Sequence, residues 1–332
     1  MADNNLLREE TGRSIWMEKG KSVLVTGGAG FIGSHVVDKL LAQGSKVVVL
    51  DDLSTGKLCN LPVGHESLRF VEGSVLDRSA VAEAARNCDA IVHLAAVASV
   101  QASIADPQRT HQVNFGGTLM LLEEAKAAGI RHFLFSSTAA VYGASDVGPI
   151  SEEERVSPLT PYAIDKLASE YYIKHFHRTY GINFTIFRFF NVFGPRQDPG
   201  SPYSGVISIF CERCNAGKSL TIFGDGEQTR DFIYVGDLSQ VIIDSILNEV
   251  VSCQTINVGT GMSVSLNELV RVLGVIYDRD VEIVYKAARS GDIRHSLANV
   301  ALLRSLYPEL PETPMLEGLR MTVAALESAL QD

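Results

Sequence analysis

The strongest constraint on the fold is a glycine-rich segment close to the start of the chain. Residues 26–35 read TGGAGFIGSH, which contains both a Gly28-x-Gly30-x-x-Gly33 and a Gly27-x-x-Gly30-x-x-Gly33 spacing. An apolar run precedes this segment and an amphipathic stretch follows it, so the glycines predict a tight turn between a strand and a helix. Glycine there also lets the backbone approach a pyrophosphate at the helix N-terminus. The segment therefore predicts a dinucleotide-binding unit.

Apolar runs alternate with amphipathic stretches up to about residue 188. The runs are short and rich in β-branched residues, which is typical of parallel strands covered on both faces. The predicted strands are residues 22–26, 46–50, 68–71, 90–94, 132–136 and 184–188. The predicted helices are residues 31–43, 79–86, 108–128 and 162–180. This alternation predicts an α/β fold, namely a Rossmann-type doubly wound parallel sheet.

The pattern changes after Asn191, where turn-forming residues crowd the segment 194–205. Residues 231–234 are predicted to form a strand that returns to the main sheet, followed by a helix over 236–247. From Gly259 onward the chain reads as a mixed α/β remainder. We therefore expect a mobile N-terminal tail (1–20), a dinucleotide-binding domain (21–190 plus about 231–258) and a smaller, mixed α/β substrate domain (191–230 and 259–332).

An acidic pair follows the second predicted strand. Asp51 lies eighteen residues beyond Gly33, close to the spacing of the carboxylate that binds the adenosine ribose in dinucleotide-binding folds. A carboxylate accepts a hydrogen bond from a free 2′-hydroxyl and repels a 2′-phosphate, so Asp51 favours NAD over NADP. We interpret the neighbouring Asp52 as a turn residue of the segment DDLSTG.

Composition and charge exclude several kinds of partner. The chain has 332 residues, 46% hydrophobic and 20% charged, which is ordinary for a globular protein. Its formal net charge of −10 argues against nucleic acid as a partner. No run of about 18 apolar residues occurs, and residues 1–20 lack the apolar core of a secretory signal. We therefore expect neither a membrane span nor secretion.

The cysteines point to a reducing compartment. Five are scattered along the chain, which is typical of reduced thiols and predicts a cytoplasmic protein. Cys211 and Cys214 form a C-x-x-C pair, but a zinc site needs two further ligands and no second pair supplies them. The pair also lacks the thioredoxin-like context of a redox site. We predict no metal site.

A tyrosine and a lysine open the last helix of the predicted sheet domain. Tyr162 and Lys166 form a Y-x-x-x-K pair, and the i, i+4 spacing places both side chains on one helical face. The lysine ammonium is expected to lower the tyrosine pKa, which makes the phenolate a usable base. The fifth strand ends in Ser136, Ser137 and Thr138, at the edge where such sheets bind ligands. These hydroxyls and the pair predict oxidation of a carbinol with hydride transfer to NAD.

These motifs, in this order, resemble the extended short-chain dehydrogenase/reductase family. The resemblance rests on TGGAGFIGSH, the strand-end acid, HLAA, SSTAAVYG, YAIDK and RDFIYVGD, and it runs from about Lys21 to the C-terminus. RFFNVFGPRQDP, GDGEQTRDF and GDIRHSLA are most similar to the UDP-sugar 4-epimerases, particularly those that accept UDP-N-acetylglucosamine. A nucleotide-sensing regulator without activity is not favoured, because this chain keeps both Tyr162 and Lys166.

The resemblance implies roles for the catalytic residues. Tyr162 is expected to take the proton of the C4 hydroxyl, and Lys166 to hold the nicotinamide ribose. Thr138 would bind the sugar hydroxyl and shuttle its proton, with Ser137 beside it. The relatives that dehydrate or decarboxylate carry acids directly after the threonine, where this chain has Ala139 and Ala140. Because eliminating water needs an acid and a base, the alanines favour epimerisation.

The resemblance also implies the residues that bind the cofactor. Ser74 replaces an acid that commonly receives the adenine amine, so the Val75 backbone is expected to contribute. Asn114 matches an asparagine near the nicotinamide, although a role in pinning a helix is equally open. The expected NAD-binding residues are Gly27, Gly30, Phe31, Ile32, Gly33, Asp51, Ser74, Val75, Leu94, Ala95, Ala96, Asn114, Tyr162 and Lys166.

Five residues match family positions that bind the UDP-sugar substrate. Arg230 and Arg289 are expected to pair with the diphosphate, together with Asn191, and Asp292 with the uridine ribose. Ser296 stands where enzymes restricted to non-acetylated sugars carry a tyrosine, so its small side chain favours a 2-acetamido sugar. UDP-glucose stays open as a second substrate, because an unfilled pocket penalises a smaller ligand only modestly.

Alternatives within the family also stay open. A UDP-glucuronate 4-epimerase needs an extra cation at C6, and Arg294 and His295 lie in the right segment. A dehydratase, or a reductase that releases NAD(P)H, is the other alternative. The resemblance implies a homodimer built from the helices predicted over 108–128 and 162–180.

Overall fold

The protein is described as a computed structural model covering residues 20–144, 148–200, 205–247, 253–288 and 293–329. A seven-stranded parallel sheet forms its centre, with strand order β11-β6-β5-β4-β1-β2-β3. The strands are β1 (Ser22–Thr26), β2 (Lys46–Asp51), β3 (Leu68–Glu72), β4 (Ala90–His93), β5 (His132–Thr138), β6 (Asn183–Phe189) and β11 (Gln254–Val258). The Rossmann-type doubly wound sheet predicted from the sequence is confirmed. The predicted tail lies almost wholly outside the described residues.

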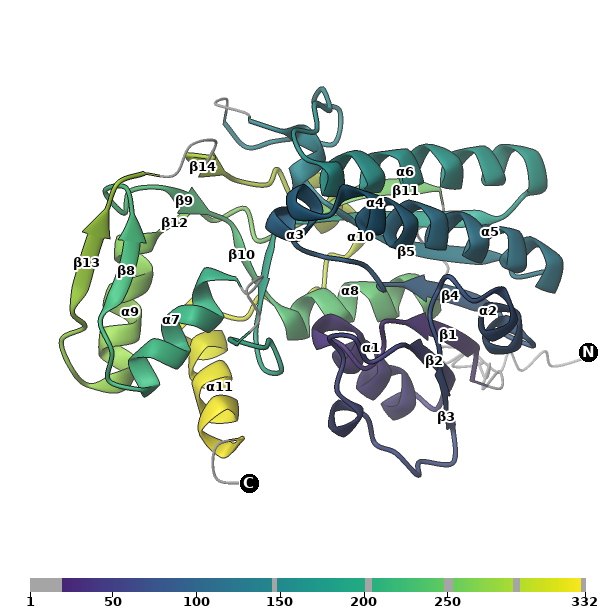
Figure 1. Ribbon diagram of the computed structural model, residues 1–332, viewed down its shortest axis with the longest axis horizontal. Helices are drawn as coiled ribbons and strands as arrows, with labels where there is room; N and C mark the ends of the chain where they lie inside the picture. Colours follow the sequence, from purple (N-terminus) through teal and green to yellow (C-terminus); the bar gives the residue numbers. More distant parts are fainter. Residues whose placement is uncertain (1–19, 145–147, 201–204, 248–252, 289–292, 330–332) are drawn as a thin grey trace, which may run out of the picture.

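Helices cover both faces of this sheet (Figure 1). On one face, α1 (Phe31–Ala42) and α8 (Val235–Leu247) pack in the larger apolar core. On the other face, α2 (Arg78–Ala85), α5 (Gly117–Ala128) and α6 (Pro161–Tyr180) share a second core. Because both faces are buried, the strands carry continuous apolar runs rather than alternating ones.

The helix predicted over 108–128 is present and contains a π-helical turn. The chain forms the short helices α3 (Val100–Ala105) and α4 (Pro107–His111), then a π-helical turn over Gln112–Gly116, and only then α5. Short 3-10 turns lie at Leu58–Asn60 and Ala139–Tyr142. A π turn inside a helix inserts one residue per turn, and such turns occur frequently at functional sites.

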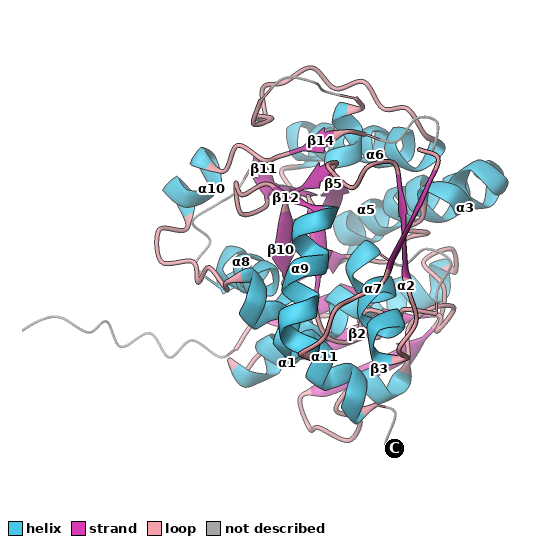
Figure 2. Ribbon diagram, turned by 90° about the vertical axis from the view of Figure 1, so that its left-hand side faces the viewer, coloured by secondary structure: helices cyan, strands magenta, loops and turns pink. Residues whose placement is uncertain are grey.

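A smaller unit follows the sheet in the sequence. Its core lies between α7 (Val206–Asn215), α9 (Leu266–Tyr277) and α11 (Met315–Ser328). Figure 2 looks onto this unit, with these helices in front of the main sheet. Its short strands pair as β7 (Asn191–Phe193) with β10 (Phe232–Tyr234), β8 (Leu220–Phe223) with β13 (Ile283–Lys286), and β9 (Thr229–Arg230) with β12 (Val264–Ser265) and β14 (His295–Ser296).

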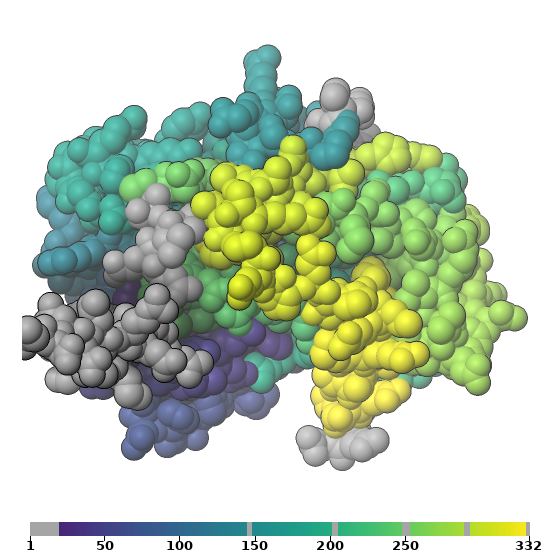
Figure 3. Space-filling model, turned by 180° about the vertical axis from the view of Figure 1, so that it is seen from behind, coloured from purple at the N-terminus to yellow at the C-terminus, as the bar shows by residue number. Residues whose placement is uncertain are grey.

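Two expectations about this part of the chain are wrong. The strand predicted at 231–234 pairs with β7 in a separate two-stranded sheet, and β11 takes the seventh place in the main sheet. Residues 298–307, assigned to the substrate domain, bury Ala298, Val300 and Leu303 in the core of the nucleotide-binding unit, together with α10 (Ala301–Leu306). Figure 3 shows this C-terminal segment crossing the back of the molecule before α11.

Candidate active site

A cavity of about 380 Å³ lies along the C-terminal edge of the parallel strands. Its wall includes most of the residues predicted to bind a cofactor or to act in catalysis: Gly27, Gly30, Phe31, Ile32, Gly33, Asp51, Val75, Leu94, Ala95, Ala96, Ser137, Thr138, Tyr162 and Lys166. Ser74 and Asn114 are not among the lining residues. Segments far apart in the sequence therefore meet at one sheet edge, as the parallel topology requires.

The glycine loop leaves no room for side chains at two positions. Gly27 has a φ of 69°, and a β-carbon there would lie 2.7 Å from the amide nitrogen of Ala95. A β-carbon on Gly33 would lie 2.1 Å from the carbonyl oxygen of Gly27. Helix α1 starts directly after Gly30, so its free amide groups face the cavity. This close approach fits the diphosphate of a dinucleotide.

Asp51 is fixed at the end of β2. Its Oδ2 accepts a hydrogen bond from the Ala29 amide at 2.9 Å, and its Oδ1 accepts one from the Leu53 amide at 2.9 Å. Burial raises the pKa of the carboxyl group, and the two amide bonds oppose this effect. Each oxygen keeps a second lone pair for a ribose hydroxyl. The residue thus fits the predicted ribose contact.

Helix α6 brings the tyrosine and the lysine to the end of β5. Thr160 caps the helix and Pro161 occupies its first turn, which starts the helix directly before Tyr162. Tyr162 and Thr138 both line the cavity, and Lys166 Nζ donates to the Ser136 carbonyl oxygen at 2.7 Å. The predicted grouping of Thr138, Tyr162 and Lys166 is therefore present.

Burial shifts the pKa values of both the tyrosine and the lysine. Burial raises the pKa of Tyr162 to about 12, and only the hydrogen bond with Thr138 opposes the shift. Burial lowers the pKa of Lys166 to about 7, against a smaller opposing effect of Asp165. The low dielectric disfavours both charged forms more strongly than the pair stabilises them. Burial thus moves the tyrosine pKa in the direction opposite to the one expected from the spacing alone.

Ser137 lines the cavity together with Thr138, but its hydroxyl takes another direction. Its hydroxyl points to the opposite side of β5 and donates to Glu170 Oε1 at 2.5 Å. Neighbouring side chains of a strand point to opposite faces, so Ser137 shares the face of Phe133 and Phe135, against α6. The proton of this hydroxyl is thus donated to α6, while Ser137 still forms part of the cavity wall.

Asn114 has the pinning role that the sequence left open. Its Oδ1 accepts from the Val97 amide at 2.8 Å, and its Nδ2 donates to the Val97 carbonyl oxygen at 3.1 Å. Asn114 lies in the π-helical turn, which aims its side chain at the loop after β4. Val97 lines the cavity, so Asn114 shapes the wall through Val97.

The cavity wall contains residues that the sequence did not identify. Arg109 comes from the short helix α4, Phe190 lies directly before β7, and Val192 lies within β7. No spacing rule marks them, because they reach the cavity from the short helix before the π-helical turn and from a small separate sheet. Val192 adjoins Asn191, so the cavity extends toward the predicted substrate residues.

Three of the five predicted substrate residues lie within the described part of the chain, and two do not. Arg230 and Ser296 are paired in register on β9 and β14, and Asn191 begins β7, where its Nδ2 donates to the Asp231 carbonyl oxygen at 3.2 Å. Arg289 and Asp292 lie outside the described residues. The structure therefore places Ser296 directly beside Arg230.

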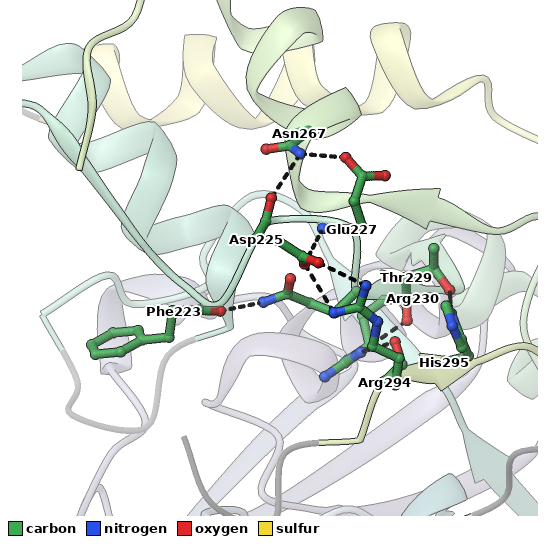
Figure 4. Close-up of polar contacts among 9 residues, drawn as sticks. Phe223, Asp225, Glu227, Thr229, Arg230, Asn267, Arg294 and His295 are labelled. Carbon is green, nitrogen blue, oxygen red and sulfur yellow. Dashed lines mark hydrogen bonds and ion pairs between the residues drawn. The ribbon is translucent and has the colours of Figure 1, made fainter. Parts of the chain in front are cut away.

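Arg294 and His295, the two candidates for an extra cation at C6, both make polar contacts with residues near β9 (Figure 4). Arg294 makes a two-point ion pair with Asp225, with both nitrogen–oxygen distances at 2.9 Å. This pair lowers the pKa of Asp225 to about 2, chiefly through the hydrogen bonds from Arg294. His295 Nδ1 lies 2.9 Å from the Thr229 hydroxyl. Both side chains are thus engaged with the chain itself.

The C-x-x-C pair lies in the core of the smaller unit. Cys211 and Cys214 are 0% and 1% exposed on α7, and burial raises the pKa of the Cys211 thiol to about 12. Such thiols are poor nucleophiles and poor metal ligands at neutral pH.

Within the described part of the chain, no helix is both long and apolar enough to cross a membrane.

Tyr162 and Lys166 share one cavity with a glycine loop and a fixed ribose-type carboxylate, which is the arrangement of a nicotinamide-dependent enzyme acting on a carbinol carbon. The family described as "NAD dependent epimerase/dehydratase family" matches residues 23–259, and the chain belongs to this family. It is therefore an enzyme, of the isomerase class, that uses NAD.

Relatives and solved structures agree with this assignment. The UDP-glucose 4-epimerase of Mycolicibacterium smegmatis is 38% identical over 307 residues, covering 90% of this chain and 96% of that protein. The UDP-N-acetylglucosamine 4-epimerase from Methanobrevibacter ruminantium, solved with UDP-N-acetylmuramic acid, has a TM-score of 0.90 and 40% identity, covering 94% of this chain and 100% of that chain. The Thermus thermophilus UDP-glucose 4-epimerase, solved with NAD, has a TM-score of 0.85 and 35% identity, covering 93% and 99%.

Proposed function

We propose that this protein is a UDP-hexose 4-epimerase that interconverts UDP-GlcNAc and UDP-GalNAc, and that it also accepts UDP-Glc and UDP-Gal. The observation that carries the proposal is the joint placement of Thr138, Tyr162 and Lys166 in the wall of the cofactor cavity. Similar enzymes named UDP-sugar 4-epimerases support the reaction. The small Ser296 beside Arg230 supports the acetylated substrate.

In the proposed mechanism, Tyr162 acts as the tyrosinate and accepts the proton of the C4 hydroxyl, which Thr138 holds and passes to it. When bound, NAD would supply the oxidant for C4 and then its reductant, as acceptor and donor of the hydride. Lys166 would hold the nicotinamide ribose, and its ammonium group would stabilise the tyrosinate before it accepts the proton. The 4-keto sugar turns in the cavity before it is reduced on its other face. Tyr162 then returns the proton to the new hydroxyl.

In this proposal, charged and polar residues in and near the smaller unit bind the UDP part of the substrate. Arg230 and Arg289 pair with the diphosphate, with Asn191 alongside, because a guanidinium matches phosphate oxygens in a forked geometry. Asp292 accepts the uridine ribose hydroxyl. Ser296 leaves the volume that a 2-acetamido group fills.

Elimination and uronate chemistry are less well supported. Ala139 and Ala140 follow Thr138 in a 3-10 turn, so the positions nearest the reacting sugar supply no acid for removing water. A uronate carboxylate needs a cation at C6, and Arg294 is held by Asp225. A UDP-glucuronate 4-epimerase and a dehydratase or reductase of the same family are the outcomes against which the proposal is tested.

The test follows the anomeric protons by NMR during separate incubations with UDP-GlcNAc, UDP-Glc and UDP-glucuronate. Appearance of UDP-GalNAc without net NADH supports the proposal. Conversion of UDP-glucuronate alone leaves the mechanism in place and refutes the substrate. Accumulation of NADH, or loss of water from the sugar, refutes epimerisation.

Replacing Ser296 with tyrosine should change the substrate preference. The larger ring occupies the space assigned to the acetamido group, so we expect kcat/KM for UDP-GlcNAc to fall about 100-fold relative to that for UDP-Glc. Ser296→Ala is the matched control and should keep both activities. An unchanged ratio of the two kcat/KM values in Ser296→Tyr would contradict the assignment of Ser296.

The stability of the cofactor-free protein should rise with pH because of Lys166. Its folded pKa of about 7 lies below the ordinary value of 10.5, so between these values the unfolded chain binds a proton that the folded protein does not. The unfolding free energy therefore rises with pH across this window. We expect the melting temperature of the wild type to rise relative to Lys166→Met between about pH 7 and pH 10, by calorimetry. A difference that stays flat or falls contradicts the shift.

We also propose that the protein is a cytoplasmic homodimer joined through α5 and α6. The five cysteines are free thiols, which fits a reducing compartment. On α6, Ile164, Tyr171 and Tyr172 are 51%, 58% and 42% exposed, and apolar side chains at this exposure fit a surface that a second copy covers.

A further inference from the structure

Three residues of α6, spaced four apart, meet three consecutive residues of β5. Tyr162 and Thr138 both line the cavity, Lys166 Nζ donates to the Ser136 carbonyl oxygen at 2.7 Å, and Glu170 Oε1 accepts from the Ser137 hydroxyl at 2.5 Å. The i, i+4 spacing aligns the three side chains on one side of the helix. Glu170 itself does not line the cavity, but its partner Ser137 does, so this contact ties together the helix and the strand that carry the proposed base and its partner.

An arginine of the next strand completes this contact. Arg188 on β6 stands opposite Ser137 in the sheet register. Its Nε donates to Glu170 Oε1 at 3.0 Å, and its Nη2 donates to Glu170 Oε2 at 2.7 Å. The side chains of Arg188 and Glu170 are 6% and 1% exposed. A two-point bond between a planar guanidinium and a carboxylate fixes both the separation and the orientation of the groups that carry them.

The arginine is also held from its other side. Arg188 Nη1 donates to the Tyr142 hydroxyl at 2.9 Å, and that hydroxyl donates to Asn257 Oδ1 at 2.6 Å. Tyr142 lies in the 3-10 turn directly after Thr138. Asn257 on β11 donates to the Ile150 carbonyl oxygen at 2.9 Å. The chain of bonds thus starts one residue before Thr138, at Ser137, and returns to the chain four residues after it, at Tyr142.

A contribution to folding stability is a weak explanation for the buried ion pair between Arg188 and Glu170. Removing two charges from water costs several kcal/mol per ion, and well-packed apolar residues of similar size are often as stable or more stable. The precise geometry of the bonds offers another reason. A shift of about 1 Å in a catalytic group costs up to about 100-fold in rate. A rigid tie between α6 and β5 prevents that shift.

We propose that Ser137, Glu170 and Arg188 form a positioning network that holds Tyr162 at Thr138 during catalysis. None of the three touches the reacting atoms in this proposal; they act through the helix and the strand. The inference rests on the proposed function, because it requires Tyr162 to be the base. It gives Ser137 a role different from the catalytic one that the sequence indicated.

The test begins with Ser137→Ala, which removes one buried hydroxyl and leaves the ion pair intact. We expect kcat for UDP-GlcNAc to fall about 10- to 100-fold while KM stays within about twofold, because only the alignment of the base is disturbed. A loosened bond with Thr138 also raises the pKa of Tyr162, so the rising limb of kcat against pH moves to higher pH. Tyr142→Phe, which removes the support of Arg188, should shift the same quantities less.

A matched control separates positioning from stability. Tyr307→Phe also removes a buried hydroxyl contact, with Ser245, in the core on the other face of the sheet. We expect it to lower the melting temperature without changing kcat or its pH profile. Glu170→Gln tests the charge itself; because it leaves Arg188 unpaired, its rate is compared only if its melting curve shows a folded protein.

The inference is overturned if Ser137→Ala and Tyr142→Phe keep the wild-type kcat and pH profile, whatever their melting temperatures. It is also overturned if the loss in Ser137→Ala appears in KM alone, because the residue then acts on substrate binding. A wild-type protein that converts no UDP-sugar refutes the proposed function instead. The two failures are therefore distinct.

Discussion

Tyr162→Phe should abolish epimerisation almost completely while the protein still binds NAD. The substitution removes only the phenolic oxygen, so the proton of the C4 hydroxyl loses its acceptor. General base catalysis contributes about 10²- to 10⁴-fold, and we expect kcat to fall by that factor. The ring remains, and the glycine loop and Asp51 are untouched. Bound NAD, released by denaturation and quantified by its absorbance, should stay at the wild-type level.

The matched control for this variant lies at the other end of the same helix. Tyr180 is 44% exposed, and Tyr180→Phe removes the same atom away from the cavity. It should keep wild-type activity. Wild-type activity in Tyr162→Phe would show that another group removes the proton, and the proposed mechanism would then be wrong.

Gly33→Ala should remove the cofactor and with it all activity. The added β-carbon would lie 2.1 Å from the Gly27 carbonyl oxygen and 2.7 Å from the Gly28 α-carbon. Both atoms belong to the backbone of the loop, so α1 and the loop must move apart. The amides at the start of α1 then no longer converge on a diphosphate. We expect the purified variant to contain no bound NAD and to show no turnover when NAD is added at wild-type saturating levels.

A second glycine distinguishes this effect from ordinary backbone strain. Gly44 has a φ of 75°, and a β-carbon there meets no atom within 4 Å. Gly44→Ala should cost about 1 kcal/mol of stability through its left-handed backbone and leave NAD content unchanged. Wild-type NAD content in Gly33→Ala would contradict the described geometry of the loop.

The parts of the site that the sequence predicts are those set by local spacing. Gly27 and Gly33 are fixed by the turn between β1 and α1, and Asp51 by the end of β2. Tyr162 and Lys166 follow from helical periodicity, and the shared edge of a parallel sheet brings all of these together. The sequence pattern is therefore sufficient to predict the cofactor cavity and the candidate base.

The features that the sequence did not predict depend on tertiary contacts. The direction of Ser137 follows from the alternation of β5, but its partner Glu170 can be known only once α6 is packed. The strand at 232–234 reads like any buried strand, and only its pairing with β7 removes it from the main sheet. The pKa of Tyr162 depends on burial as well as on its neighbour, so spacing alone gave the wrong direction.

The central claim is that the hydrogen at C4 leaves and returns as a hydride within one active site. The most direct test uses UDP-GlcNAc deuterated at C4, converted in ordinary water, with the UDP-GalNAc product examined by NMR and mass spectrometry. The account predicts that the product keeps the deuterium at C4, because the transferred hydride does not exchange with solvent. Replacement of that deuterium by hydrogen from water would show that C4 is deprotonated instead, and would contradict the account.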